Sequence, residues 1–215
     1  DLRGHGGSSA GWPSYGMVES AGDLVALLEH LDAGPTTVVA TSFSPTAALW
    51  AAADRPDLVA RLVLISAHLD APPIWERLPL GLAMRGPLAG KLWASQFRKW
   101  HPGAPPADLD EQCDLLAAML GDTQRRRAAR ETLIAHRDGL DDRLETLRKP
   151  MLVVMGGADS HFKDPDAAGA MIAARTGGTL HVIPDAGHYP HVEYPTRVAT
   201  VIQAFLAETA ADASS

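Results

Sequence analysis

Three short segments of this 215-residue chain carry side chains that could together perform nucleophilic chemistry. Ser42 follows a β-branched run, Asp159 follows a double glycine, and His188 ends the segment Asp185-Ala186-Gly187-His188. A serine hydroxyl is a poor nucleophile until an oriented imidazole takes its proton, and an acid commonly holds that imidazole in place. We therefore predict Ser42 as a nucleophile, His188 as its base and Asp159 as the acid that orients the imidazole.

The segment Ala40-Thr41-Ser42-Phe43-Ser44 places Ser42 at a turn between an expected strand and an expected helix. Such a turn is strained, so the residues two before and two after the nucleophile must be small. Ala40 and Ser44 meet this requirement, although glycine is the usual residue at both positions. A structural alternative is that Ser42 and Ser44 only cap the helix.

Ser44 is the rival nucleophile, and backbone chemistry argues against it. The residue after a nucleophilic serine normally donates its N–H to the oxyanion, and Pro45, which follows Ser44, has no N–H. Phe43, which follows Ser42, has one. We therefore favour Ser42 and predict the Phe43 amide as an oxyanion donor.

Asp159 is expected at the carboxyl end of a strand, where open α/β sheets bind their ligands. An aspartate after a double glycine is also a common turn residue, and Asp164 and Asp70 are alternative acids. His188 is favoured among the nine histidines because Gly187 gives its loop the freedom to turn toward the serine.

A metal-ligand set could be read from the spacing His188-x-x-His191-x-Glu193. This spacing is not the helical H-E-x-x-H pattern, and Pro190 interrupts it. We therefore expect no metal and no cofactor.

Strand-like and helix-like segments alternate on both sides of a long helical stretch. The alternation predicts an α/β fold with a mostly parallel sheet and helices on both faces. Residues 1–67 and 148–215 are expected to form this core, and residues 68–147, where prolines separate amphipathic helices, an inserted helical cap. The expected strands are 36–40, 61–66, 151–155 and 179–183, and the expected core helices are 17–31, 46–53, 167–174 and about 195–206.

Composition excludes several classes of partner. The 19 basic and 26 acidic residues give a net charge of −7 without a basic stripe, so no nucleic acid is expected. Arg125, Arg126, Arg127 and Arg130 are expected to form a solvated helix face. No apolar run of 18 residues occurs, so no membrane partner is expected. The single cysteine, Cys113, is expected to be an inert thiol, which is compatible with a reducing, cytoplasmic compartment. A homodimer is an open alternative.

The opening segment Asp1-Leu2-Arg3-Gly4-His5-Gly6-Gly7-Ser8, with Ser42, Arg55-Pro56-Asp57, Asp159 and Gly187-His188, resembles the α/β-hydrolase superfamily over nearly the whole chain. The resemblance implies a parallel-rich sheet, a helical cap and cofactor-free hydrolysis by a serine. In that family the D-x-R-G loop follows the fourth strand, and a His-Gly loop supplies a second oxyanion donor. Roughly 40 to 60 further residues are therefore expected before Asp1, and the strand at 37–40 is expected at an open sheet edge.

The resemblance also implies that the cap roofs the site. The aromatic residues Trp75, Trp93, Phe97 and Trp100 are predicted to bind an apolar small-molecule substrate, although they could serve only to hold the cap on the core. The predicted reaction is hydrolysis of a carboxylic ester, a lactone or a related acyl bond, with carbon–carbon bond hydrolysis as a sister reaction. The alternative class is a non-hydrolytic member of the fold: a ligand-binding protein, a cyclase or a pseudoenzyme.

Overall fold

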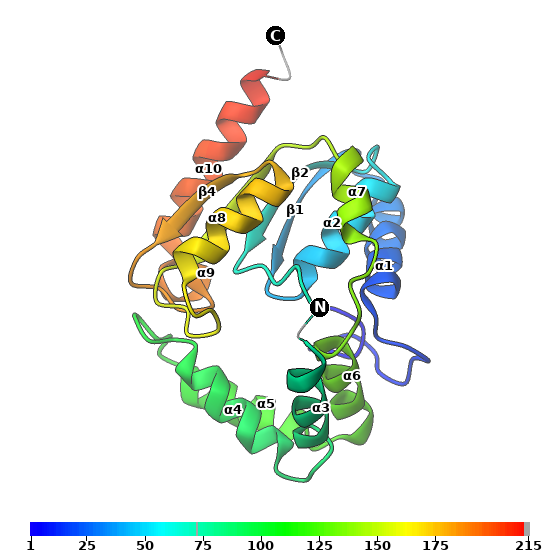
Figure 1. The fold of residues 1–215 in the computed structure, drawn as a ribbon, viewed down its shortest axis with the longest axis vertical. Helices are drawn as coiled ribbons and strands as arrows, with labels where there is room; N and C mark the ends of the chain where they lie inside the picture. Colours follow the sequence, from blue (N-terminus) through cyan, green and yellow to red (C-terminus); the bar gives the residue numbers. More distant parts are fainter. Residues whose placement is uncertain (72, 213–215) are drawn as a thin grey trace.

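A computed structural model describes residues 1–71 and 73–212 of the chain, and Figure 1 shows a sheet flanked by helices above a separate layer of helices. The four strands of the sheet are all parallel and lie in the order β1-β2-β3-β4. Their bounds are β1 Thr36–Thr41, β2 Val59–Ile65, β3 Met151–Gly156 and β4 Thr179–Ile183. Because the strands are parallel, their carboxyl ends share one edge of the sheet, and the loops that follow them meet there.

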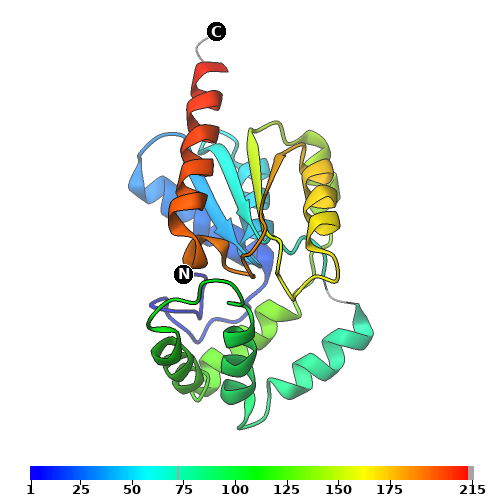
Figure 2. The ribbon, with the colours of Figure 1, turned by 90° about the vertical axis from the view of Figure 1, so that its left-hand side faces the viewer.

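Helices cover both faces of the sheet, which confirms the predicted fold class (Figure 2). Strand β2 explains this arrangement, because Leu62 and Leu64 pack on one face while Val63 and Ile65 pack on the other. The first face is covered by α1 Met17–Leu31, α2 Ser44–Asp54, α7 Leu140–Thr146 and α8 Pro165–Thr176. The second is covered by α10 Pro195–Asp212, which follows the short helix α9 Pro190–Glu193.

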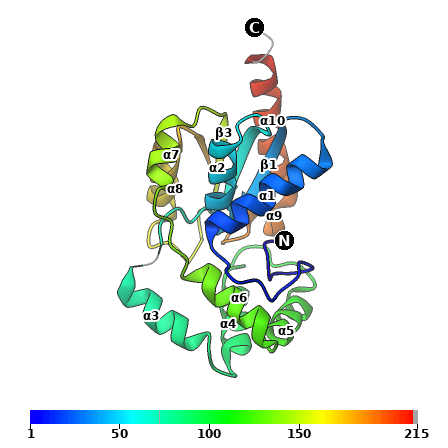
Figure 3. The same cartoon turned by 90° about the vertical axis from the view of Figure 1, so that its right-hand side faces the viewer.

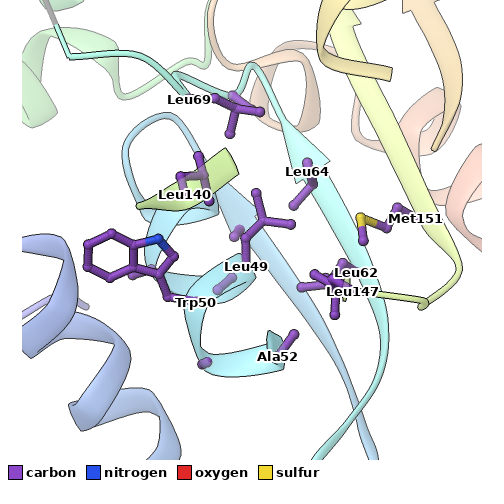
Figure 4. Packing of buried hydrophobic residues seen from close by; sticks show 14 of the residues in the cluster. Leu49, Trp50, Ala52, Leu62, Leu64, Leu69, Leu140, Leu147 and Met151 are labelled. Atoms are coloured by element: carbon purple, nitrogen blue, oxygen red, sulfur yellow. The ribbon is translucent and has the colours of Figure 1, made fainter. Parts of the chain in front are cut away.

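The core of the first face centres on helix α2 (Figure 4). Small alanines let this helix lie close to the sheet, and Leu49 packs against Leu62 and Leu64 there. Helix α2 begins at Ser44, two residues before the predicted start, and Pro45 is accepted because the first turn of a helix needs no N–H at that position. The helix therefore starts immediately behind Ser42.

Helices α3 to α6 form a layer across the carboxyl edge of the sheet (Figure 3). Their bounds are α3 Ile74–Ala83, α4 Ala89–Lys99, α5 Leu109–Met119 and α6 Thr123–Leu133. Helices α4 and α5 pack together, and Cys113 is buried between them with its Sγ 3.5 Å from the Ala94 carbonyl oxygen. Helix α7 falls within the residues predicted as the insertion, but Leu140 and Leu144 pack with α2 in the sheet core.

Strand β1 lies at one edge of the sheet formed by the described residues. Its side chain Val39 is 52% exposed, in contrast to the fully buried strand β3. Across the part of the chain that the structure describes, no helix combines the length and the hydropathy that crossing a bilayer requires.

Candidate active site

Ser42 occupies a strained turn between β1 and α2. Its φ angle of 62° lies in the left-handed region, which residues with a Cβ rarely adopt. Two backbone hydrogen bonds hold the turn: the Ser42 N–H donates to the Ile65 carbonyl at 2.9 Å, and the His68 N–H donates to the Ser42 carbonyl at 2.9 Å. The turn is therefore fixed by strand β2 and by the loop that follows it.

The rival serine, Ser44, has a structural position. Its Oγ accepts the Thr41 N–H and donates to the Thr41 carbonyl, each at 2.9 Å. This hydroxyl closes the turn locally, and no partner for proton transfer is bonded to it among the described residues. Of these two serines, Ser42 is therefore the one whose hydroxyl can bond to a residue outside the turn.

A chain of hydrogen bonds joins Ser42, His188 and Asp159. His188 Nε2 lies 2.9 Å from Ser42 Oγ, and His188 Nδ1 lies 2.7 Å from Asp159 Oδ2. Both His188 and Asp159 are buried. The second Asp159 oxygen, Oδ1, accepts the backbone N–H of His161 at 2.9 Å. In this arrangement the imidazole can take the hydroxyl proton while the carboxylate fixes its orientation and stabilises the imidazolium that forms.

The His188 loop is held by close backbone packing. The His188 N–H donates to the Trp100 carbonyl at 3.0 Å, which ties the loop to the end of α4. A Cβ on Gly187 would overlap that same carbonyl, and a Cβ on Gly156 would overlap the Gly187 carbonyl. Glycine at both positions therefore lets the loop after β4 lie against the ends of β3 and α4.

Glu193 is a residue of this site that the sequence reasoning considered only as a metal ligand. It is buried, and its Oε1 accepts the Gly187 N–H at 2.6 Å. Its Oε2 accepts the Gly103 and Ala104 N–H groups at 2.7 and 3.0 Å. One carboxylate thus bridges the His188 loop and the loop between α4 and α5, so the site and the helical layer are joined at this point.

The alternative acids are used elsewhere. Asp164 caps α8, because its side chain accepts the Ala167 N–H at 3.0 Å. Asp70 pairs with Arg175 at 2.9 Å. Neither is hydrogen-bonded to a histidine among the described residues, so Asp159 is the acid that the fold brings to His188.

An apolar pocket of about 450 Å³ lies directly over Ser42. Of the four predicted substrate-binding aromatics, Trp93, Phe97 and Trp100 line it, together with Phe43. Trp75 does not line this pocket: it is 72% exposed on α3, so the structure does not bring it together with the other three. The remaining apolar wall comes from helices α5 and α6, through Leu116, Met119, Leu120, Ala129 and Leu133.

Two partly exposed arginines of α6, Arg125 and Arg127, attach this helix to the N-terminal loop. Arg125 donates to the Gly6 carbonyl at 2.9 Å, and Arg127 donates to the Pro13 carbonyl at 2.7 Å. Gly6 and Arg125 both line the pocket. These two side chains thus bond to a neighbouring loop as well as facing solvent, a contact that helical periodicity does not predict.

Two further histidines pack around the His188 ring. The His68 ring lies 5.4 Å from that of His188 and is stacked on Phe162, and the His161 ring lies 5.2 Å from that of His188. Burial, together with the neighbouring His161 and His188, lowers the pKa of His68 to about 2. Desolvation of its ring, which packs against Trp100 and His68, followed by the influence of His188, lowers the pKa of His161 to about 4 although the residue is exposed on one side. Both rings are therefore neutral lone-pair donors near pH 7.

Residues 1–201 match the alpha/beta hydrolase family. The chain belongs to this family. Among its relatives is lipase LipV of Mycobacterium tuberculosis, which is 30% identical over 96% of this chain and 81% of its own length. An esterase structure from Thermogutta terrifontis is 25% identical, with a TM-score of 0.74, and covers 97% of this chain and 78% of its own. The enol-lactonase structure from Burkholderia xenovorans shares the fold at 20% identity and a TM-score of 0.77, over 96% of this chain and 79% of its own.

Membership of the alpha/beta hydrolase family agrees with the position of these residues on the sheet. Ser42 follows β1, Asp159 follows β3 and His188 follows β4, so all three come from loops at the carboxyl edge. His68 follows β2, so each of the four strands is followed at this edge by one of these side chains. The sequence did not single out His68 or His161, because each stands alone in a stretch without a recognisable motif; the signal that was present is their place directly after predicted strands.

Proposed function

We propose that this protein is a serine hydrolase that cleaves a carboxylic ester, lactone or related acyl bond of an apolar small molecule. The observation that carries the proposal is the hydrogen-bonded chain from Ser42 through His188 to Asp159, opening into an apolar pocket. The family and its lipase and esterase relatives support the same chemistry.

In the proposed reaction, Ser42 Oγ attacks the carbonyl carbon while His188 Nε2 takes its proton. The bond to the leaving alcohol then breaks, and His188 returns the proton to that oxygen. A water molecule, deprotonated by the same imidazole, hydrolyses the acyl-serine and releases the acid. Asp159 keeps the imidazole in the tautomer that both half-reactions need.

The oxyanion is proposed to form beside the Phe43 amide. Phe43 is the N-cap residue of α2, so its amide lies at the end of the helix where partial positive charge gathers. A donor placed there stabilises charge that develops only in the transition state, and the loss of one such donor typically costs on the order of 10² to 10³ in turnover.

The substrate class follows from the pocket walls. Trp93, Phe97 and Trp100 present aromatic surface, and α5 and α6 add aliphatic side chains. A hydrocarbon acyl or leaving group gains affinity there from the carbon surface that it buries, at about 25 cal/mol per Å². We therefore propose a substrate with an apolar chain or ring next to the scissile bond.

Labelling with a fluorophosphonate probe, combined with hydrolysis of p-nitrophenyl butyrate, tests the proposal. Wild-type protein should take up one probe per chain, and Ser42→Ala should lose both labelling and at least about 10⁴ of kcat. Ser44→Ala is the matched control, since it removes a hydroxyl two residues away and should still be labelled. An unlabelled wild-type protein that binds an apolar ligand would favour the non-hydrolytic alternative.

Asp159→Asn tests the orienting role separately from the nucleophile. An amide can stabilise the wrong imidazole tautomer, so kcat should fall by about 10⁴. Asp164→Asn is the matched control, because asparagine also caps a helix and the residue lies outside the hydrogen-bonded chain. Equal activity of the two variants would assign the orienting acid to another residue.

A further inference from the structure

A second chemical feature lies beside the His188 ring. His68, His161 and His188 each offer one ring nitrogen, and these atoms lie within 4.8 Å of one another. The three residues come from the loops after β2, β3 and β4, so parallel strands deliver them to one point. Among the residues that the structure describes, this is the one group of histidine, cysteine or acidic side chains with such spacing.

The hydrogen bonding of the cluster suits a metal ion. His68 Nε2 is fully buried, and no hydrogen-bond partner is present for it among the described residues. Buried polar atoms are normally paired, so an unpaired imidazole nitrogen beside two other imidazoles needs an explanation. The neutral nitrogen of an imidazole is a common ligand of Zn²⁺.

His188 carries the outer-shell partner that zinc-binding histidines usually have. A metal-bound imidazole commonly donates its other N–H to a carboxylate, which fixes its tautomer and raises its basicity. Asp159 already holds His188 Nδ1 at 2.7 Å, which leaves Nε2 as the nitrogen that can turn to a metal. A metal on Nε2 would displace the Ser42 hydroxyl, which uses that atom now.

The cluster is also accessible. A pocket of about 350 Å³, which adjoins the one over Ser42 at Phe43, Trp93, Trp100 and Leu133, is lined by His68 and His161. Glu76 lies on its wall, and so does Asp70, whose carboxylate is already paired with Arg175. His161 is the most exposed of the three histidines. Nitrogens that share one tetrahedral Zn²⁺ lie about 3.3 Å apart, given Zn–N bonds of about 2.0 Å. The cluster must therefore contract by about 1.5 Å at most.

We propose that His68, His161 and His188 form a three-histidine site for Zn²⁺ and that metal binding there inhibits the serine by occupying His188 Nε2. The metal binds as an inhibitor and supplies no step of hydrolysis. The inhibitory half of the proposal rests on the proposed serine hydrolase function. The metal site itself does not, because its three ligands are present whether or not Ser42 is a nucleophile.

Metal binding is measured first, without reference to activity. Protein stripped with a chelator and dialysed is titrated with Co²⁺, whose visible absorption reports tetrahedral nitrogen coordination, and with Zn²⁺ by calorimetry. Wild type and Ser42→Ala should each bind one ion per chain. His68→Phe and His161→Phe should weaken binding by more than about 100-fold, since each removes a direct ligand.

The matched control for these variants is His136→Phe, which removes an exposed histidine outside the cluster and should bind the metal like wild type. Because His161 is exposed, His161→Phe is expected to fold even if His68→Phe does not, and circular dichroism checks both. Zn²⁺ should inhibit p-nitrophenyl butyrate hydrolysis with the same midpoint as its binding. In His161→Phe, the Zn²⁺ concentration that halves this variant's own metal-free rate should rise by the same factor as the weakening of its metal binding.

The outcomes separate the two proposals. Absence of Co²⁺ binding by wild type, or unchanged binding by both ligand variants, overturns the metal site. Binding that depends on His68 and His161 while the rate stays constant or rises overturns inhibition. If the fluorophosphonate never labels the protein but Co²⁺ binding still needs these histidines, the metal site stands and the hydrolase proposal fails.

Discussion

The sheet core and the helical layer α3 to α6 are built differently although they meet at the same site. Residues 62 to 65 of β2 are fully buried, and α2 buries every residue from Pro45 to Ala52. In the layer, the two apolar clusters contain only four and three buried residues. Helix α3 exposes large apolar side chains to solvent, among them Trp75, Leu78 and Leu82.

This difference separates reaction geometry from substrate selection. Ser42, Asp159 and His188 come from loops at the carboxyl ends of β1, β3 and β4, and backbone hydrogen bonds to neighbouring strands and loops hold these loops in place. The pocket walls come mainly from α4, α5 and α6, whose packing is sparser. We infer that substitutions in the layer can reshape the pocket without moving the hydrogen-bonded chain.

The largest expected contrast is in stability. Leu49→Ala removes a side chain that is 0% exposed at the centre of the first core face, so it should lower the free energy of unfolding by about 3 kcal/mol. Leu78→Ala, on a layer residue that is 67% exposed, should change it by less than about 0.5 kcal/mol. Urea unfolding of both variants measures the difference, and equal losses would mean that the layer is as tightly packed as the core.

The core was predictable because its signals are local. The short apolar runs before Ser42 and Asp159 favour strands, and strands that alternate with helices form parallel sheets. Parallel strands then require their following loops to share one edge. Pro45 selected Ser42 over Ser44 from the sequence alone, and in the structure the Ser44 hydroxyl is bonded to Thr41.

The parts that escaped prediction depend on packing between distant segments. Glu193 bridges the loops at Gly103 and Gly187, and helix α7 joins the core through leucines that periodicity cannot assign to one layer or the other. The prediction for Trp75 failed for the same reason. Its residue type suits a pocket, but only the orientation of α3 decides that it faces solvent.

The pH dependence of stability probes the boundary where core and layer meet. The pKa of His68 is about 2 in the folded protein, against 6.5 for an unperturbed histidine. Between these values the unfolded chain binds a proton that the folded protein does not, so His68 costs stability as the pH falls below 6.5. From pH 7.5 to pH 5 this cost is about 2 kcal/mol.

His68→Phe should remove that cost, since phenylalanine can keep the stack on Phe162 without a titrating ring. The free energy of unfolding of this variant relative to wild type should therefore rise by about 2 kcal/mol between pH 7.5 and pH 5. His136→Phe, on an exposed residue, should follow the wild-type curve. Parallel curves for all three proteins would mean that the His68 ring is protonated equally in the folded and unfolded states.

The smallest expected effect tests most directly whether the core sets the reaction geometry while the layer selects the substrate. It changes one helix of the layer and measures whether selectivity changes alone. Leu116 of α5 lines the pocket over Ser42, whereas its neighbour Leu115 is 62% exposed. Leu116→Trp places an indole in space that a long acyl chain would fill. The ratio of kcat/KM for p-nitrophenyl octanoate to that for the acetate should therefore fall about tenfold.

Leu115→Trp makes the same chemical change one residue away and should keep that ratio within about twofold of wild type. The acetate rate of both variants should stay near the wild-type value, because neither position contacts the hydrogen-bonded chain from Ser42 to Asp159. A fall in the acetate rate of Leu116→Trp would show that the layer transmits strain to the reacting groups. In that case the layer would control the chemistry as well as the choice of substrate.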